Sequence, residues 1–275
     1  MDQEIPRGCE LPNQLFNTRK SFIGMIHLPP LPGSPRWGGN LNKVLERARQ
    51  EAEVLANGGT NGIIVENYGD APFRIGRVES ETVAAMTLAV QAIQEVSTLP
   101  VGINMLRNDA GSALAIAAVT GARFIRVNVH YGIMAAYEGL VEGEAFETVR
   151  RRKSLGVDVK ILADVLVKHA SPLGKTDLGM MARETSTRGM ADGLIISGPA
   201  TGYPTSTTDL AAARREVPGG FILVGSGITE SNARDMLAIT DGAIVGTSLK
   251  HESRITNPID PQRVKAMAEI FAEFS

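Results

Sequence analysis

The sequence Val224-Gly225-Ser226-Gly227-Ile228-Thr229 is followed, one helix length later, by Asp241-Gly242-Ala243-Ile244-Val245-Gly246-Thr247-Ser248. Each stretch has the pattern of a short apolar strand that ends in glycine and small hydroxyl residues. Such a turn exposes backbone N–H groups that no side chain covers, and we expect Thr229 to open a helix with a partly positive N-terminus. Two such turns side by side form a cradle for a phosphate or another small anion. In a (β/α)8 barrel this cradle follows strands 7 and 8.

Six further runs along the chain have the same strand-like character. They are short, rich in Ile and Val, and bounded by glycine or polar residues, as is typical of strands buried on both faces. Helical patterns fill the intervals. Eight strand–helix repeats in 275 residues predict an α/β fold with a single closed (β/α)8 (TIM) barrel, and an open doubly wound sheet is the alternative. The expected strands are residues 22–27, 62–66, 101–104, 124–130, 157–164, 193–197, 221–225 and 242–246.

The predicted barrel domain covers residues 21–275, and an irregular N-terminal arm, residues 1–20, precedes it. The arm is either a loose terminus or a segment that closes the bottom of the barrel or reaches a neighbouring subunit. We expect a homo-oligomer. No basic stretch followed by an apolar run begins the chain, and no run of about 18 apolar residues occurs, so neither a signal peptide nor a membrane span is expected.

Composition excludes several classes of function. The formal net charge is −2 and aromatic residues make up 5% of the chain, which argues against nucleic acid as a partner. A single cysteine, Cys9, rules out an internal disulfide and suits a reducing cytoplasm. No Gly-x-Gly-x-x-Gly follows the first strand, so the chain has no nucleotide-cofactor motif.

Three of the four histidines, His27, His130 and His169, fall at or just beyond the predicted carboxyl ends of strands, where TIM barrels carry their active sites. This clustering indicates a functional site. For each histidine taken singly, the alternative is a structural hydrogen bond to a loop carbonyl.

Glu66 and Asp164 are the strongest candidates for acid–base work, because a carboxylate at the end of a buried strand costs free energy unless it is paired. The alternative is that they pair with Arg126 or Lys160 and hold the barrel together. For Lys160 the alternatives are a Schiff base and a salt bridge inside the barrel, and the salt bridge is the favoured expectation.

The candidate ligands for a metal are the same histidines and carboxylates, but none has H-E-x-x-H or H-x-H spacing. The metal signal is therefore weak and no cofactor is assigned. Small polar residues and glycines at the strand ends complete the predicted site for an anionic small molecule. These substrate-binding candidates are Asn104, Asn128, Ser197, Gly198, Thr201, Gly202, Gly225, Ser226, Gly227, Gly246 and Thr247.

Several longer motifs carry a family resemblance. They include residues 23–35 (IGMIHLPPLPGSP), 66–73 (ENYGDAPF), 124–130 (FIRVNVH), 163–170 (ADVLVKHA) and 197–202 (SGPATG). With these motifs the chain resembles the BtpA/SgcQ family from about residue 20 to 265. The resemblance implies a TIM barrel of the phosphate-binding group. The family is named for a cyanobacterial protein needed for stable photosystem I, but its relatives also occur in non-photosynthetic organisms, some beside sugar-uptake genes, which favours a metabolic enzyme.

Two hypotheses of function follow. The leading one is an enzyme, an isomerase, lyase or hydrolase, that acts on a small phosphorylated or sugar- or nucleoside-type metabolite. In it, Asp164 and Glu66 do acid–base or electrostatic work, with His27, His130 and His169 as helpers. The alternative is a non-catalytic assembly or regulatory factor that acts by protein contact, as the photosystem I role of the family implies.

Overall fold

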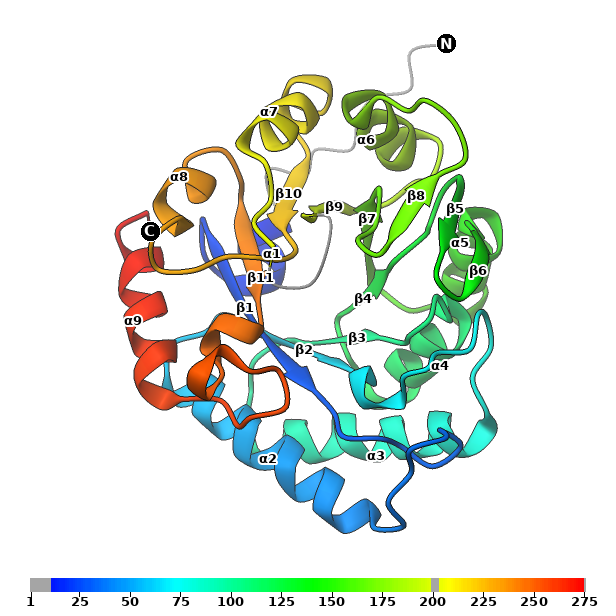
Figure 1. The fold of residues 1–275 in the computed structure, drawn as a ribbon, viewed down its shortest axis with the longest axis vertical. Coiled ribbons are helices and arrows are strands. Elements are labelled where there is room, and N and C mark those ends of the chain that lie inside the picture. Colours follow the sequence, from blue (N-terminus) through cyan, green and yellow to red (C-terminus); the bar gives the residue numbers. More distant parts are fainter. Residues whose placement is uncertain (1–10, 199–202, 275) are drawn as a thin grey trace.

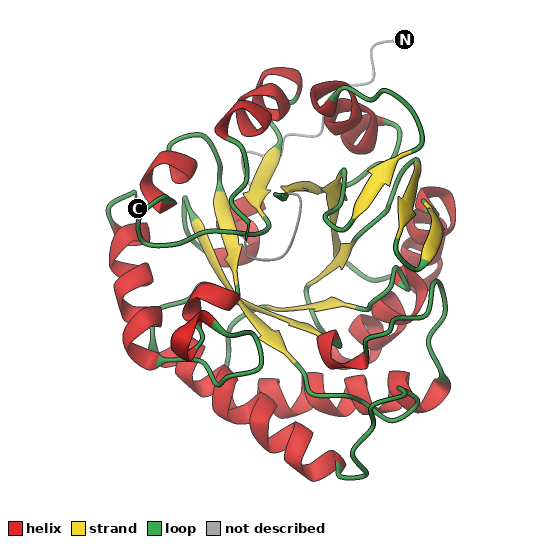
Figure 2. Cartoon of the chain, viewed as in Figure 1, coloured by secondary structure: helices red, strands yellow, loops and turns green. Residues whose placement is uncertain are grey.

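The computed structural model describes residues 11–198 and 203–274, and its strands form the closed parallel barrel that the sequence predicts (Figures 1 and 2). The strand order around the barrel is β1-β11-β10-β9-β7-β4-β3-β2. The strand bounds are β1 (Ser21–His27), β2 (Gly62–Glu66), β3 (Val101–Asn104), β4 (Phe124–Val127), β7 (Lys160–Val165), β9 (Gly193–Ile196), β10 (Phe221–Val224) and β11 (Gly242–Val245).

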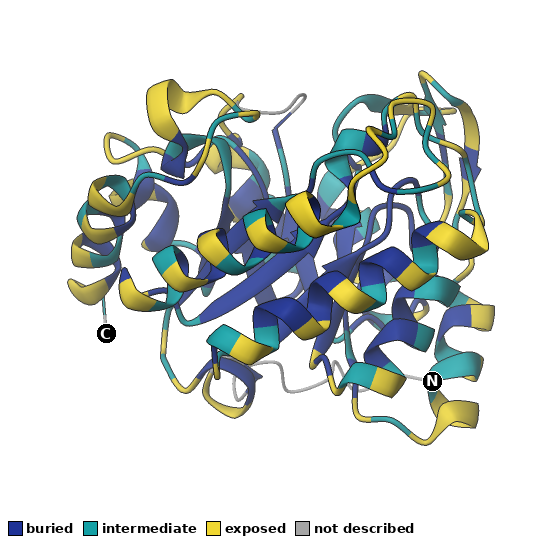
Figure 3. Cartoon of the chain, turned by 90° about the horizontal axis from the view of Figure 1, so that it is seen from below, coloured by how far each residue is buried: buried dark blue, intermediate teal, exposed yellow. Residues whose placement is uncertain are grey.

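Helices surround the barrel and bury one face each against the strands (Figure 3). Their starts follow capping chemistry: the Asp109 carboxylate accepts a hydrogen bond from Ser112 N at 2.9 Å, and Gly121 ends the same helix with φ +75°. The helices are α2 (Leu41–Asn57), α3 (Ser80–Val96), α4 (Ala110–Thr120), α5 (Ala145–Leu155), α6 (Leu178–Thr187), α7 (Thr207–Glu216), α8 (Ala233–Leu237) and α9 (Pro261–Ala272), with 3₁₀ turns at η2 (Tyr68–Asp70), η3 (Thr247–Leu249) and η4 (His251–Ser253).

The described part of the N-terminal arm closes the bottom of the barrel. Helix α1 (Leu11–Phe16) places the Phe16 ring 5.5 Å from that of Phe124 and 6.2 Å from that of Phe221. Both partners are the first residues of their strands, so these contacts mark the amino-terminal end. Leu11 and Leu15 are buried in the same interior cluster. The lower half of the barrel is therefore filled with apolar side chains, which leaves the upper end for the site.

Strand β4 is shorter than predicted, because it ends at Val127 and does not reach His130. The Asn108 side chain explains the ending. Its amide donates to Val129 O at 2.9 Å, and its carbonyl oxygen accepts from Val129 N at 2.8 Å. These bonds occupy the backbone groups of Val129 that a longer strand would use for the β ladder.

A small antiparallel sheet, which the sequence analysis did not predict, lies beside the upper end of the barrel (Figure 1). It consists of β5 (Ile133–Ala136), β6 (Gly139–Glu142) and β8 (Ala170–Pro172), in the order β6-β5-β8. The first two strands follow β4, and the third follows β7. Among the described residues, no helix is long and apolar enough to cross a membrane.

Candidate functional site

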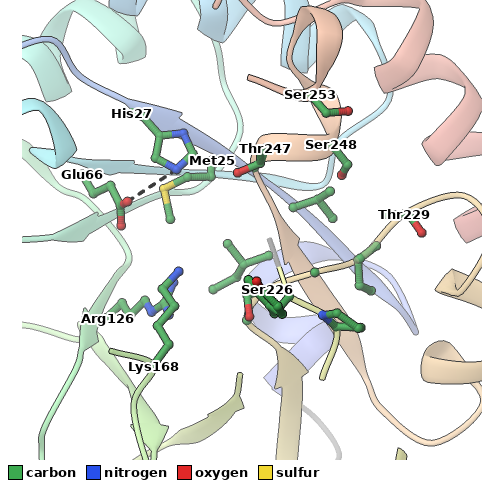
Figure 4. Close-up of a pocket in the computed structure, with 18 residues that line it drawn as sticks. Met25, His27, Glu66, Arg126, Lys168, Ser226, Thr229, Thr247, Ser248 and Ser253 are labelled. Carbon is green, nitrogen blue, oxygen red and sulfur yellow. Dashed lines mark ion pairs between the residues drawn. The ribbon is translucent and has the colours of Figure 1, made fainter. Parts of the chain in front are cut away.

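A cavity of about 560 Å³ opens at the carboxyl ends of the barrel strands (Figure 4). Both glycine-rich tail turns contribute to its wall, because β10 and β11 are paired neighbours in the barrel. The structure thus brings the two turns together around one space, as expected. The lining residues are Met25, His27, Glu66, Arg126, Lys168, Tyr203, Pro204, Gly225, Ser226, Gly227, Ile228, Thr229, Ile244, Val245, Gly246, Thr247, Ser248 and Ser253.

The two turns present backbone donors that have no partner elsewhere in the described chain. Gly227 has φ +70°, and a Cβ there would lie 2.1 Å from Tyr203 O, so only glycine fits. The Ser248 hydroxyl is buried in the cavity wall without a hydrogen-bond partner among the described residues. No hydrogen bond to another described residue engages the backbone N–H of Ser226, Gly227, Ile228, Gly246, Thr247 or Ser248.

The expectation that a helix opens at Thr229 is wrong. Helix α8 begins only at Ala233 and is five residues long. The Thr229 N–H donates to Asn232 Oδ1 at 2.9 Å, so it is not free for a ligand. The donors of this wall are therefore the glycine turns and the first residues of η3, without the N-terminus of a long helix.

Asp164, at the end of β7, is saturated with hydrogen bonds. Its two oxygens accept from Arg126 Nε and Arg126 Nη2, each at 2.8 Å, and the side chains of the pair are 0% and 1% exposed. Asn128 Nδ2 donates to the same carboxylate at 2.9 Å and Ser197 Oγ at 3.2 Å. Asp164 is therefore behind the cavity wall and holds the Arg126 guanidinium, which lines the cavity.

His27 and Glu66 form a histidine–carboxylate pair in the cavity wall. His27 Nε2 is 3.5 Å from Glu66 Oε1, and Asn104 Nδ2 donates to Glu66 Oε2 at 2.9 Å. Burial lowers the pKa of the His27 imidazole well below its ordinary value of 6.5, and the positive charges of Lys250 and Lys168 add to the shift. The imidazole is therefore neutral at pH 7 and able to accept or relay a proton beside a carboxylate.

Lys168 also lines the cavity, close to Arg126 in Figure 4, although it was not among the candidate residues. The turn after β7 brings it there, since Leu166 and His169 both have positive φ, at 53° and 59°. The signal in the sequence that could have identified Lys168 is a positive charge three residues beyond the end of a strand.

The other two histidines do not meet His27, contrary to the predicted cluster. His130 is fully buried, and its Nε2 lies 2.7 Å from Gly189 O, which is the structural bond to a loop carbonyl considered above. The His169 ring packs near Tyr137, with 6.4 Å between ring centroids, and lines a separate hollow. Neither ring lines the barrel-mouth cavity.

The remaining predicted residues fall into three positions. Ser197 and Gly198 line the neighbouring hollow, and Gly198 N donates to Ser226 Oγ at 3.1 Å, so they support the first glycine turn. Thr201 and Gly202 lie outside the described residues. Lys160 begins β7 at the opposite end of the barrel and pairs with the exposed Asp158 at 2.6 Å, so the expected bridge inside the barrel is wrong.

No group of three or more His, Cys, Asp or Glu side chains in residues 11–198 and 203–274 is arranged to hold a metal ion. The described site is made of hydrogen-bond donors, two cations and one histidine–carboxylate pair.

The chain matches the model of the BtpA family over residues 18–273. It is 53% identical to the Photosystem I biogenesis protein BtpA of Synechocystis over 94% of this chain and 91% of the relative. It is 30% identical to the putative sgc region protein SgcQ of Escherichia coli K12, over 93% and 96% of the two chains. Among solved structures, N-(5'-phosphoribosyl)anthranilate isomerase from Pyrococcus furiosus superposes with a TM-score of 0.54 and 14% identity, covering 92% of this chain and 99% of that one, which shows a shared TIM-barrel fold.

Proposed function

This chain belongs to the BtpA family, and from that premise we propose that it is an enzyme whose substrate is a small phosphorylated, sugar- or nucleoside-type metabolite bound in the barrel-mouth cavity. The observation that carries the proposal is the meeting of two walls in one cavity. Uncommitted backbone N–H groups of the two tail turns form one wall, and Arg126, Lys168 and the His27–Glu66 pair form the other, with the His27 ring next to Gly246 where the two walls meet.

Each wall suits one end of such a ligand. Converging backbone N–H groups and a free hydroxyl bind phosphate oxygens without the entropic cost of ordering long side chains. The reacting end of the ligand then faces a neutral imidazole beside a carboxylate, which is the pairing that general acid–base chemistry uses. The buried Arg126 is positioned to stabilise negative charge that develops there.

Thermal unfolding tests the phosphate end. We expect inorganic phosphate and sugar phosphates to raise the melting temperature, and the matching unphosphorylated sugars to raise it much less. At a ligand concentration of one hundred times Kd the stabilisation is about 2.7 kcal/mol. For a domain of this size that is roughly 5–11 °C. The proposal fails if no phosphate-bearing compound shifts the transition.

Ser248→Ala provides the matched variant, because its hydroxyl is unpartnered in the described chain and lines the cavity. Loss of one hydrogen bond to a charged ligand is expected to weaken phosphate binding by roughly tenfold or more. Ser154→Ala, at an exposed position of α5, is the control and leaves binding unchanged.

The second candidate function is an assembly factor, which the identity to a protein named for photosystem I biogenesis favours. Glu66→Gln separates the two functions, because glutamine still accepts the hydrogen bond from Asn104 but cannot exchange a proton as a carboxylate does. Both forms of this chain are introduced into a Synechocystis strain that lacks the relative. If this chain acts as an enzyme, only the unchanged chain restores photosystem I. Equal restoration by Glu66→Gln identifies an assembly factor.

A further inference from the structure

Two lysines point inward, and their surroundings differ. Lys250 is completely buried, and its Nζ lies 2.8 and 2.7 Å from the two carboxylate oxygens of Glu51. Lys168 is partly buried and lines the cavity, but no carboxylate of the described residues lies within ion-pair distance of its Nζ. One ammonium has a carboxylate partner at hydrogen-bond distance, and the other has none among the described residues.

The carboxylates nearest to Lys168 are already engaged. Asp164 accepts both arms of Arg126, and Glu66 is held by His27 and Asn104. Asp164 neutralises Arg126 at close range, and each of the two carboxylates offers Lys168 only a distant attraction.

The surroundings of Lys168 make its neutral amine more accessible than that of an exposed lysine, although the side chain still binds a proton at pH 7 as the cavity's second cation. Burial lowers the pKa of the Lys168 ammonium, and the positive charge of Arg126 lowers it further. The carboxylates of Glu66 and Asp164 raise it, and Arg107 lowers it. Together these effects lower the pKa of Lys168 from its ordinary value of 10.5. A larger fraction of Lys168 is therefore neutral amine near pH 8 than of an exposed lysine.

The backbone of Lys168 is fixed while its side chain faces the ligand space. Arg107 Nη2 donates to Lys168 O at 3.2 Å, which anchors the turn after β7. Figure 4 shows the side chain extending beside Arg126 into the cavity, opposite Ser226 and Thr247. A ligand whose phosphate sits on the tail turns therefore presents its far end to Lys168.

We propose that Lys168 is a covalent nucleophile, whose Nζ forms an imine with the aldehyde or ketone carbon of a phosphorylated substrate. This inference rests on the proposed function and narrows its substrate class to phosphorylated carbonyl compounds. It also narrows the reaction to those that an imine assists, namely cleavage or formation of a carbon–carbon bond or proton transfer beside the carbonyl carbon.

The covalent step needs no further reactant. The neutral amine attacks the carbonyl carbon, a C–N bond forms and the C=O π electrons move to oxygen. Both amine protons then leave with that oxygen as water, and the C=N bond remains. A proton from solvent then binds the imine nitrogen, and the resulting iminium attracts electrons from the neighbouring carbon; the His27–Glu66 pair lies in the same cavity to take up the proton released there.

Pyridoxal 5'-phosphate is a suitable probe, because it carries an aldehyde and a phosphate on one small ring. The full-length protein is incubated with one equivalent, reduced with borohydride, digested and analysed by mass spectrometry. We expect labelling of Lys168 at least tenfold ahead of the exposed Lys43, Lys153, Lys175 and Lys265. Excess inorganic phosphate is expected to suppress it tenfold, and pyridoxal without phosphate to label it tenfold more slowly.

A pH series adds a readout that a purely structural lysine does not move. The labelling rate of Lys168 is expected to reach half its maximum at a lower pH than that of the exposed lysines. Labelling confined to exposed lysines overturns the inference, as does Lys168 labelling that is insensitive to inorganic phosphate. Both results come from the unchanged protein and do not depend on the folding of a variant.

Lys168→Arg then separates this inference from the proposed function. Arginine keeps the positive charge but forms no stable imine with an aldehyde of this kind, so trapping is lost while inorganic phosphate still raises the melting temperature. Lys175→Arg, at an exposed position, is the matched control and keeps both responses. Phosphate stabilisation without trapping in the unchanged protein overturns the imine alone, and absence of both overturns the proposed function as well.

Discussion

The buried pair of Arg126 and Asp164 makes a sharp prediction about stability. Asp164→Asn leaves one oxygen and one NH2 group where two oxygens accept from the guanidinium at 2.8 Å. The NH2 group of the new amide therefore faces an N–H donor of the Arg126 guanidinium, and the Arg126 charge stays buried without its counter-ion. Breaking a buried pair in this way costs about 3–5 kcal/mol. For a domain of this size the melting temperature falls by roughly 6–20 °C.

A double variant shows whether the unpaired charge causes the loss. Arg126→Met with Asp164→Leu removes both charges and keeps an apolar filling, which is often neutral for a buried pair. Here the Asn128 amide loses its acceptor, and Asn128 Oδ1 already has no partner in the described chain, so a cost of about 1–3 kcal/mol remains. The double variant is thus expected to be more stable than Asp164→Asn.

Urea unfolding followed by circular dichroism measures both variants against the unchanged protein. Glu95→Gln is the control, because its ion pair with Arg49 is largely exposed, and it changes the free energy of unfolding by less than about 1 kcal/mol. A loss below about 1 kcal/mol for Asp164→Asn, or a double variant less stable than the single one, refutes the reasoning.

Three further predictions concern stability. Phe16→Ala is expected to cost about 3–5 kcal/mol in the free energy of unfolding, because it empties the bottom of the barrel, whereas Val119→Ala at an exposed site changes it by less than about 0.5 kcal/mol. Glu51→Gln is expected to destabilise more than Lys250→Met in urea unfolding, because the first leaves a fully buried ammonium unpaired, while Glu51 keeps Arg47 in the second. Because the pKa of His27 is lowered in the folded state, the folded protein binds fewer protons than the unfolded chain, and the free energy of unfolding falls as pH drops through 6.5. Unfolding measured from pH 8 to 5 is expected to show a smaller pH dependence for His27→Asn than for the unchanged protein.

The barrel could be predicted from the sequence because each strand is a short apolar run with a glycine or polar end. Residues 62–66 and 101–104 match the strands β2 and β3 without correction. The predicted strand 124–130 is too long, because Val-Asn-Val-His continues the strand pattern in the sequence. In the structure, the side chain of Asn108, which is distant in sequence, forms the backbone hydrogen bonds of Val129 instead of a neighbouring strand. The strands β5, β6 and β8 have mixed burial, so no apolar run or clean alternation marks them.

The site was predictable only where a side chain belongs to a strand end or to the first residues after it. His27 and Glu66 are the last residues of β1 and β2, and the tail turns follow β10 and β11 directly. Lys168 lies beyond a left-handed turn at Leu166, and leucine rarely adopts positive φ, so the sequence does not signal that the chain turns back there.

The charge that a ligand meets in the cavity differs from the charge of the chain. The formal net charge of the protein is −2, yet the charged groups among the described lining residues are Arg126, Lys168 and Glu66, beside a His27 held neutral. Asp164 cancels part of the Arg126 charge from behind the wall, but its oxygens are saturated with hydrogen bonds and Asp164 does not line the cavity. Because electrostatic interactions are stronger in a partly desolvated cavity than at the surface, the cations and the free N–H groups together favour an anionic ligand. We expect an uncharged sugar to gain little from this arrangement and a phosphorylated one to contact both walls, so that the phosphate, more than the sugar, decides binding.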